Sequence, residues 1–259
     1  MTTWQFWRYI IRPPQDNPIY QRMLSQAGPA IPWYVGCAEI FAFVLILPMV
    51  AFIGPVYSLG WVIGISSHIA RARENGVLDL LSLAPPGPLG ASFALAVASM
   101  HREGALARIS QRSTWSGRLT VMLLVYVTLA PRLAAGESIL GTLGALLVLT
   151  AALYPDHVQS ISLACAAGML AADFSASRAN AQWLAFLLLF TFQAGAYGAA
   201  LTLYLLLTSD AALQMTGAAL AAVLTLLLMR EGLFLLLWRA LVYRFGAATV
   251  LDLANHRAV

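Results

Sequence analysis

The sequence predicts an all-α integral membrane protein, and three features carry this prediction. Of the 259 residues, 60% are hydrophobic and only 10% are charged, and the mean hydropathy is +0.77, values unlike those of a soluble domain. Apolar runs recur along the chain at about the 20-residue length that crosses a bilayer. The runs are continuous rather than alternating, so they predict membrane helices and not the strands of a barrel.

The chain divides into an N-terminal segment, residues 1–32, and a polytopic membrane domain, residues 33–259. In the N-terminal segment Trp4, Trp7 and Ile11 recur at helical spacing, with arginines on the neighbouring face. Aromatic rings at headgroup level and arginines near phosphates are typical of a helix in the membrane interface. We therefore expect an N-terminal interfacial elbow helix and contact with membrane lipid.

Six stretches of the membrane domain are predicted to span the bilayer. They are residues 33–53, 55–71, 118–133, 138–154, 183–207 and 211–229. Residues 72–117 are too polar to cross as a whole and are predicted to be cytoplasmic. Residues 231–246 carry two arginines and are predicted to form a C-terminal amphipathic helix outside the hydrocarbon.

The short apolar stretch 158–173 decides the number of spans. If it does not cross, both termini are cytoplasmic and Arg132 alone of the fifteen arginines faces outward. If it crosses, Arg178 and the four C-terminal arginines move outside, against the positive-inside rule. We therefore expect six spans in the inner (plasma) membrane, with 158–173 a re-entrant or interfacial segment before span five, buried against protein.

Composition and motifs also limit the chemistry expected of this chain. All fifteen basic residues are arginine, so a P-loop, which needs a lysine, is excluded. Hydrolase motifs such as H-E-x-x-H and G-x-S-x-G are absent, and Cys37 and Cys165 are isolated in apolar segments. We expect no enzymatic activity, no metal site and no cofactor in the chain, and no nucleic-acid partner, because the arginines flank apolar runs as topology signals.

Residues 60–86, GWVIGISSHIARARENGVLDLLSLAPP, form the most informative segment. An apolar run ends in arginines, turns into a short amphipathic piece and stops at prolines. Gly76 permits a left-handed backbone at this corner, with leucines able to face lipid or a groove and charged side chains at the rim, as in helix-in-groove recognition. An ordinary interfacial helix with no partner is the alternative. The residues predicted to contact a partner are Arg73, Glu74, Gly76, Leu78, Asp79 and Leu81.

This segment resembles that of the permease subunits of type-2 ATP-binding-cassette exporters. Those permeases carry, after span two, the pattern E-R-x-x-G-T-x-[DE]-x-L followed by proline, and residues 72–81 here read ARENGVLDLL before Pro85 and Pro86. Val77 stands in place of the threonine, the order of carboxylate and arginine differs, and the motif match covers roughly residues 60–100. The resemblance implies a coupling helix that docks on a separate ATPase subunit, and a second permease subunit in a homo- or heterodimer.

Two further sets of residues are candidates for roles inside the membrane. Glu39 and His68 are expected at similar depth in the hairpin of the first two spans, where Glu39 pairs with His68 or Arg71, or else serves as a proton-responsive gate or substrate contact. Gly60 and Gly64 form a small-xxx-small face for helix packing.

Gln193 and Tyr197 place a polar strip in span five, which either lines a path or hydrogen-bonds to a neighbouring helix. A different class of function also stays open, that of a structural or accessory subunit of a larger respiratory or photosynthetic membrane complex.

Overall fold

The computed structural model describes residues 1–12, 15, 17–25, 53–82, 87–101, 106, 140–207 and 212–245. These residues form helices and no strands, which confirms the all-α class. The predicted span 118–133, and the span 33–53 with the exception of Ile53, lie outside the described residues.

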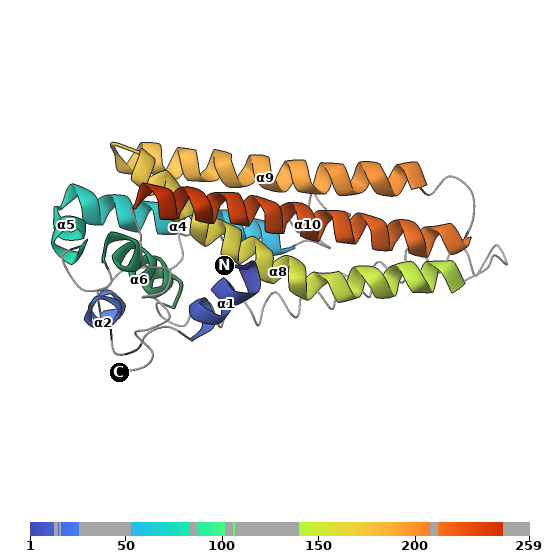
Figure 1. The fold of residues 1–259 in the computed structure, drawn as a ribbon, viewed down its shortest axis with the longest axis horizontal. Helices are drawn as coiled ribbons and strands as arrows, with labels where there is room; N and C mark the ends of the chain where they lie inside the picture. The colour runs from blue at the N-terminus through green and yellow to red at the C-terminus, as the bar shows by residue number, and fades with distance from the viewer. Residues whose placement is uncertain are drawn as a thin grey trace.

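Three long helices run side by side in an elongated bundle (Figure 1). They are α8 (Leu140–Phe174), α9 (Arg178–Leu207) and α10 (Ala212–Arg244). The helix α4 (Ile53–Glu74) packs along α8 and α9. The predicted span 55–71 therefore lies within α4, and 138–154 overlaps the first half of α8.

Shorter helices gather around one end of the bundle (Figure 1). They are α1 (Thr3–Ile11), α2 (Pro18–Ser25), α5 (Val77–Ser82) and α6 (Gly87–His101). At this end α4 and α10 finish, and a three-residue turn joins α8 to α9. We call the opposite end, where α8 and α10 begin and α9 finishes, the far end.

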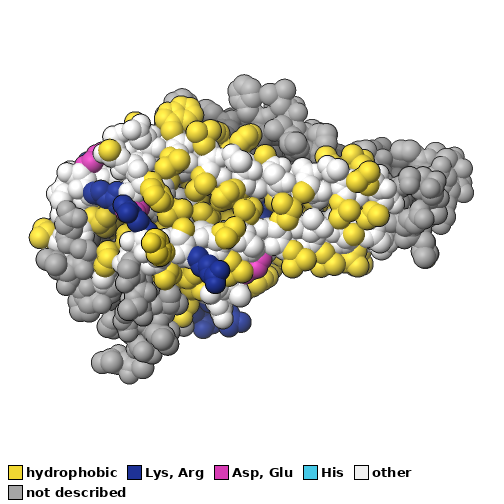
Figure 2. Space-filling view, turned by 45° about the horizontal axis from the view of Figure 1, so that its top comes forward, with side chains coloured by type: hydrophobic (Ala, Val, Ile, Leu, Met, Phe, Trp, Pro, Cys, Tyr) yellow, Lys and Arg dark blue, Asp and Glu magenta, His cyan; other side chains and the backbone are white. Residues whose placement is uncertain are grey.

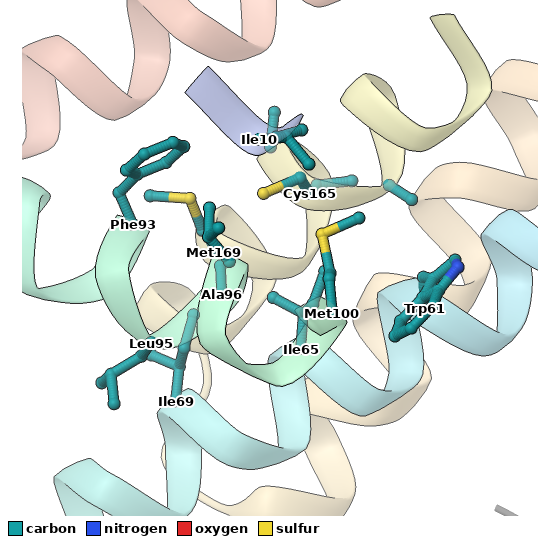
Figure 3. Close-up of a cluster of buried hydrophobic side chains, with 14 of the residues drawn as sticks. Ile10, Trp61, Ile65, Ile69, Phe93, Leu95, Ala96, Met100, Cys165 and Met169 are labelled. Carbon is teal, nitrogen blue, oxygen red and sulfur yellow. The ribbon is translucent and has the colours of Figure 1, made fainter. Parts of the chain in front are cut away.

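The hydrophobic core lies where α6 and the second half of α8 meet α4. Every residue of 89–100 in α6 and of 156–172 in α8 is buried. Figure 3 shows Ile65 and Ile69 of α4 packed with residues of α6 and α8 in this cluster. The small residues of α8 allow close approach, since a Cβ on Gly168 would lie 2.9 Å from Ile65 Cγ2.

The prediction that 158–173 is a separate re-entrant or interfacial segment is wrong. The segment is the second half of α8, a continuous 35-residue helix with Pro155 in its interior. A proline can remain inside a helix at the cost of one backbone hydrogen bond and a kink. Here the residues after Pro155 are held in helix by packing on all sides, so the segment is indeed buried against protein, but as the centre of the core.

The predicted break between 211–229 and a C-terminal amphipathic helix is also absent. The helix α10 runs without interruption from Ala212 to Arg244. The prediction placed the break at Arg230 and Glu231, where the apolar run is interrupted by charge. Both side chains have partners inside the bundle, as described below, so the charges do not end the helix.

The helix predicted in the N-terminal segment is present as α1, but it is not simply an interfacial helix. Thr2 caps it in a capping box with Gln5. Phe6 and Ile10 are fully buried, and the Phe6 ring lies 5.2 Å from that of Phe234 in α10. Trp4 is instead 42% exposed, so the helix is wedged against α6, α8 and α10 rather than lying wholly on a surface.

Two of the described helices, α9 and the Thr216–Arg244 part of α10, are long and apolar enough to cross a membrane by length and composition. Only 28% and 33% of their most apolar windows are buried inside the protein. Figure 2 shows hydrophobic side chains along the long bundle and arginine side chains toward the end with the short helices. Their length, composition and exposure make these two helices candidates to cross a membrane.

Candidate functional site

The corner between α4 and α5 has the sharp turn that the sequence predicted. Gly76 has φ +66°, a left-handed conformation that glycine adopts without steric cost. Its N–H donates to the carbonyl of Arg73 at 2.8 Å, closing the last turn of α4. The short helix α5 starts at the next residue.

The helix α5 presents different side chains to solvent from those we predicted. Leu78 was expected to face lipid or a groove, but it is 5% exposed and belongs to the hydrophobic core. Leu80 is 70% exposed and Val77 is partly exposed. The side chains of Asp79 and Leu81 lie outside the described residues.

Arg73, predicted to contact a partner protein, binds the end of α8. Its Nη2 lies 2.8 Å from Asp173 Oδ1. Its Nη1 donates to the carbonyls of Ala172 at 2.6 Å and Asp173 at 3.0 Å. Carbonyls at a helix C-terminus lack partners within the helix and carry partial negative charge, so a guanidinium satisfies them chemically and electrostatically.

The neighbouring residue, Glu74, binds the beginning of α9. Its Oε1 accepts a hydrogen bond of 2.8 Å from the backbone N–H of Arg178, the first residue of that helix. The Arg178 side chain returns to α4, where its Nε donates to Ser67 Oγ at 2.6 Å. A carboxylate at a helix N-terminus is the favourable match for the dipole.

The helix α10 joins the same group through its last residue. Arg244 Nε lies 2.7 Å from Asp173 Oδ2, so one carboxylate binds arginines from α4 and α10. We call Arg73, Glu74, Asp173, Arg178 and Arg244 the terminal clamp. It ties the ends of α4, α8 and α10 to the start of α9, next to α5.

A second polar group lies inside the bundle, around the middle of α9. Arg230 of α10 is fully buried, and its Nη1 lies 2.5 Å from Oδ1 of Asp156, whose side chain is only 2% exposed. The same Nη1 donates to Ser160 Oγ at 3.0 Å and to the Asp156 carbonyl at 3.3 Å, and Nη2 donates to Gln193 Oε1. The Tyr197 hydroxyl donates to Asp156 Oδ1 at 2.5 Å. We call these five residues the buried polar cluster.

This cluster shows how the polar strip of span five is used. Gln193 and Tyr197 hydrogen-bond to α10 and α8, the second of the two possibilities that the sequence left open. The Arg230 guanidinium also lies over the Tyr197 ring, with Cζ 4.5 Å from the centroid, a cation–π geometry. Three helices are thereby cross-linked by one arginine.

The structure corrects the interpretation of Arg230 as a cytoplasmic topology signal. Its position at the end of an apolar run suggested a hydrated anchor. A buried guanidinium needs a counter-ion and several acceptors, and these come from α8 and α9. The sequence around Arg230 does not show which residues supply the counter-ion and the acceptors. The one signal that could have pointed to them is Asp156, a charged residue within an apolar stretch, which in a membrane segment often marks a functional site.

Next to the cluster, Glu231 binds the N-terminal helix. The backbone N–H of Thr3 donates to Glu231 Oε1 at 3.0 Å, and the Thr3 hydroxyl donates to Oε2. Gln159 Nε2 reaches the Leu227 carbonyl at 3.1 Å and lies 3.5 Å from Glu231 Oε2. Glu231 thus holds the positive end of α1 against α8 and α10.

The remaining predicted residues are placed as follows. Glu39 lies outside the described residues, so its pairing with His68 or Arg71 stays a prediction. His68 lies half-buried in α4, and the Arg71 side chain is exposed. A Cβ on Gly64 would meet nothing within 4 Å, so the close contact of α4 with α8 is made at Gly168 rather than there.

Within the described ranges no three His, Cys, Asp or Glu side chains gather as a metal site would require. No protein-family model, curated protein or solved structure matches the chain significantly. A clamp at one end and an ion pair in the interior join long helices whose outer faces are apolar.

Proposed function

We propose that this chain is the transmembrane permease subunit of an ATP-driven exporter, coupled to a separate ATPase at the corner of α4 and α5. The first support is the surface of the bundle. Large apolar side chains are exposed along α8, α9 and α10, among them Leu147, Leu187, Leu206 and Leu228. Lipid is the solvent that favours such a surface.

The distribution of charge supports an orientation. Residues 140–155, 196–207 and 212–229, which make up the far end of the three long helices, contain no charged side chain. The arginines of the terminal clamp lie at the opposite end. By the positive-inside rule that end faces the cytoplasm in a multi-pass protein of the inner membrane. Cytoplasmic termini and the six-span topology are part of this proposal.

The observation that carries the proposal is the exposed helix at that end. The short helix α5 follows the left-handed turn at Gly76 and shows Leu80 to solvent at 70% exposure, beside a clamp that reaches α4, α8, α9 and α10. An exposed apolar residue on a short helix that is itself anchored in the core, here by Leu78, suits docking into a groove of another protein. The resemblance of residues 72–81 to the exporter motif supports the proposal that this other protein is the ATPase.

The same resemblance suggests a second permease subunit, since six spans form half of a pathway in that family. The ATP-binding chemistry then belongs to the partner, and this chain supplies the membrane path. On α5 the exposed apolar side chains are Leu80 and Val77, whereas Leu78 is buried. We therefore add Leu80 and Val77 to the proposed contact set, in which Arg73 and Glu74 also hydrogen-bond within the chain.

The test is co-purification from the native membrane with the wild-type chain and two variants at one position. Leu80→Asp places a charge on the docking face and should lose a stoichiometric ATPase subunit, while Leu80→Met should retain it. Because Leu80 is largely exposed, both variants should unfold at the wild-type temperature. Recovery of redox or light-harvesting subunits with the wild type, and no ATPase, would instead favour an accessory subunit.

A further inference from the structure

We propose that Arg73 and Glu74 form a rigid relay, through which a displacement of α5 moves the turn between α8 and α9. The purpose of this relay, to carry the conformational change of the ATPase into the membrane helices, rests on the proposed function. These two positioning residues are adjacent in sequence and lie in the last turn of α4. One binds the end of α8 and the other binds the start of α9.

The charges of the pair match the two helix ends that they bind. The Arg73 guanidinium donates to the last carbonyls of α8, where the helix dipole is negative. The Glu74 carboxylate accepts from the first N–H of α9, where the dipole is positive. Exchanging the two residue types would put each charge against a like partial charge, so the order Arg-Glu is specific to this arrangement.

The connection from α5 to this pair is short and constrained. Only Asn75 and Gly76 separate α4 from α5, and both backbone N–H groups are bonded into the last turn of α4. Leu78 anchors α5 in the core. A planar guanidinium with two or more directed hydrogen bonds holds orientation as well as distance, so a push on α5 reaches the α8–α9 turn without slack.

Beyond the turn, the long helices carry the displacement further. The Asp173 carboxylate also binds Arg244, which brings in α10. The helix α8 extends 35 residues, about 52 Å at the rise of an α-helix. It bears Asp156, which joins it to α9 and α10 in the buried polar cluster. The terminal clamp and the buried polar cluster therefore connect α8 to its neighbouring helices at two separate points along its length.

Energetics separate this role from that of a stabilising ion pair. The Arg73 and Asp173 side chains are 31% and 13% exposed, and partly exposed pairs add little to stability. We therefore expect their loss to change local exchange and transmission more than the unfolding temperature. The matched control is Arg71→Met. Arg71 lies within one turn of Arg73 and Glu74 on α4 and is exposed, and its side chain has no hydrogen bond or ion pair with another described residue.

The first measurement is hydrogen exchange by mass spectrometry on the purified chain in nanodiscs, without any partner. The double variant Arg73→Met/Glu74→Gln should raise exchange in residues 172–180 roughly tenfold, the effect of losing a helix cap. Arg71→Met should leave that segment unchanged. Equal exchange in the double variant and the wild type would overturn the relay, whatever the chain co-purifies with.

The second measurement uses the complex with its ATPase, compared with ADP and with ATP plus vanadate. In the wild type both α5 and residues 172–180 should change their exchange between the two states. In the double variant α5 should still respond while 172–180 no longer does, with the ATPase still bound. A turn that responds equally in the double variant would overturn transmission through the pair. If the wild type carries no ATPase, the proposed function fails and the first measurement alone decides the relay.

Discussion

The buried ion pair between Arg230 and Asp156 predicts a large and asymmetric response to mutation. Arg230→Met keeps a long, flexible side chain but removes the charge and the hydrogen bonds to α8 and α9. The Asp156 carboxylate, only 2% exposed, then has Tyr197 as its remaining side-chain donor among the described residues. An ionised carboxylate left in this position has lost its counter-ion and cannot regain water.

The magnitude follows from that imbalance. Removing one partner of a buried pair costs about 3–5 kcal/mol, against a total stability of about 5–15 kcal/mol for a typical folded protein. Replacing both partners, in Arg230→Met/Asp156→Leu, removes the unpaired charge as well and should cost less than about 1–2 kcal/mol. With each single variant costing about 3–5 kcal/mol, the coupling energy of the double-mutant cycle, the sum of the two single costs less the double cost, should be at least about 4 kcal/mol.

The assay is reversible unfolding in mixed micelles, followed by tryptophan fluorescence, for the wild type, both single variants and the double variant. Arg230→Lys serves as the control for charge without the planar fork, and should fall between the wild type and Arg230→Met. If Arg230→Met unfolds within about 1 kcal/mol of the wild type, or the double variant is as unstable as the worse single variant, the assignment of a mutually dependent buried pair is wrong.

Three other changes test the packing and the turn by the same unfolding assay. Gly168→Ala should destabilise the protein by about 1–3 kcal/mol, because the new Cβ would lie 2.9 Å from Ile65 Cγ2. The control Gly64→Ala should be neutral or slightly stabilising, because its Cβ would meet nothing within 4 Å. Equal effects of the two substitutions would refute the close contact at Gly168. Gly76→Ala should cost about 1–2 kcal/mol from its left-handed backbone alone, as its Cβ has open space, and a neutral result would contradict that turn. Phe6→Ala should cost about 3–5 kcal/mol, since Phe6 is fully buried, and a loss below about 1 kcal/mol would show that α1 is not part of the core.

The class of the fold was accessible from sequence because it depends on local properties. Length and continuity of apolar runs predict membrane helices wherever they occur. The turn at Gly76 and the short helix after it followed from a glycine between the arginines that end an apolar run and a short amphipathic segment. The N-terminal helix followed from the helical spacing of Trp4, Trp7 and Ile11.

The boundaries of the long helices were not accessible in the same way. Pro155 and the charged pair at 230–231 are ordinary signals for the end of a span, and both signals were misleading here. Their cost is offset by contacts from other helices. Packing around 158–172 maintains α8 past the proline, and Asp156 maintains α10 past Arg230.

Local patterns of residues are enough to predict that this chain is helical, where its apolar segments lie, and that a turn and a short helix follow Arg73. The roles of the charged residues depend on how the helices pack together. Arg73 and Glu74 bind helix ends about 100 residues away in sequence, and Arg230 binds a carboxylate 74 residues away. Periodicity and propensity act over one or two turns of a helix, whereas a charge in an apolar bundle is stabilised by whichever group the fold brings within about 3 Å.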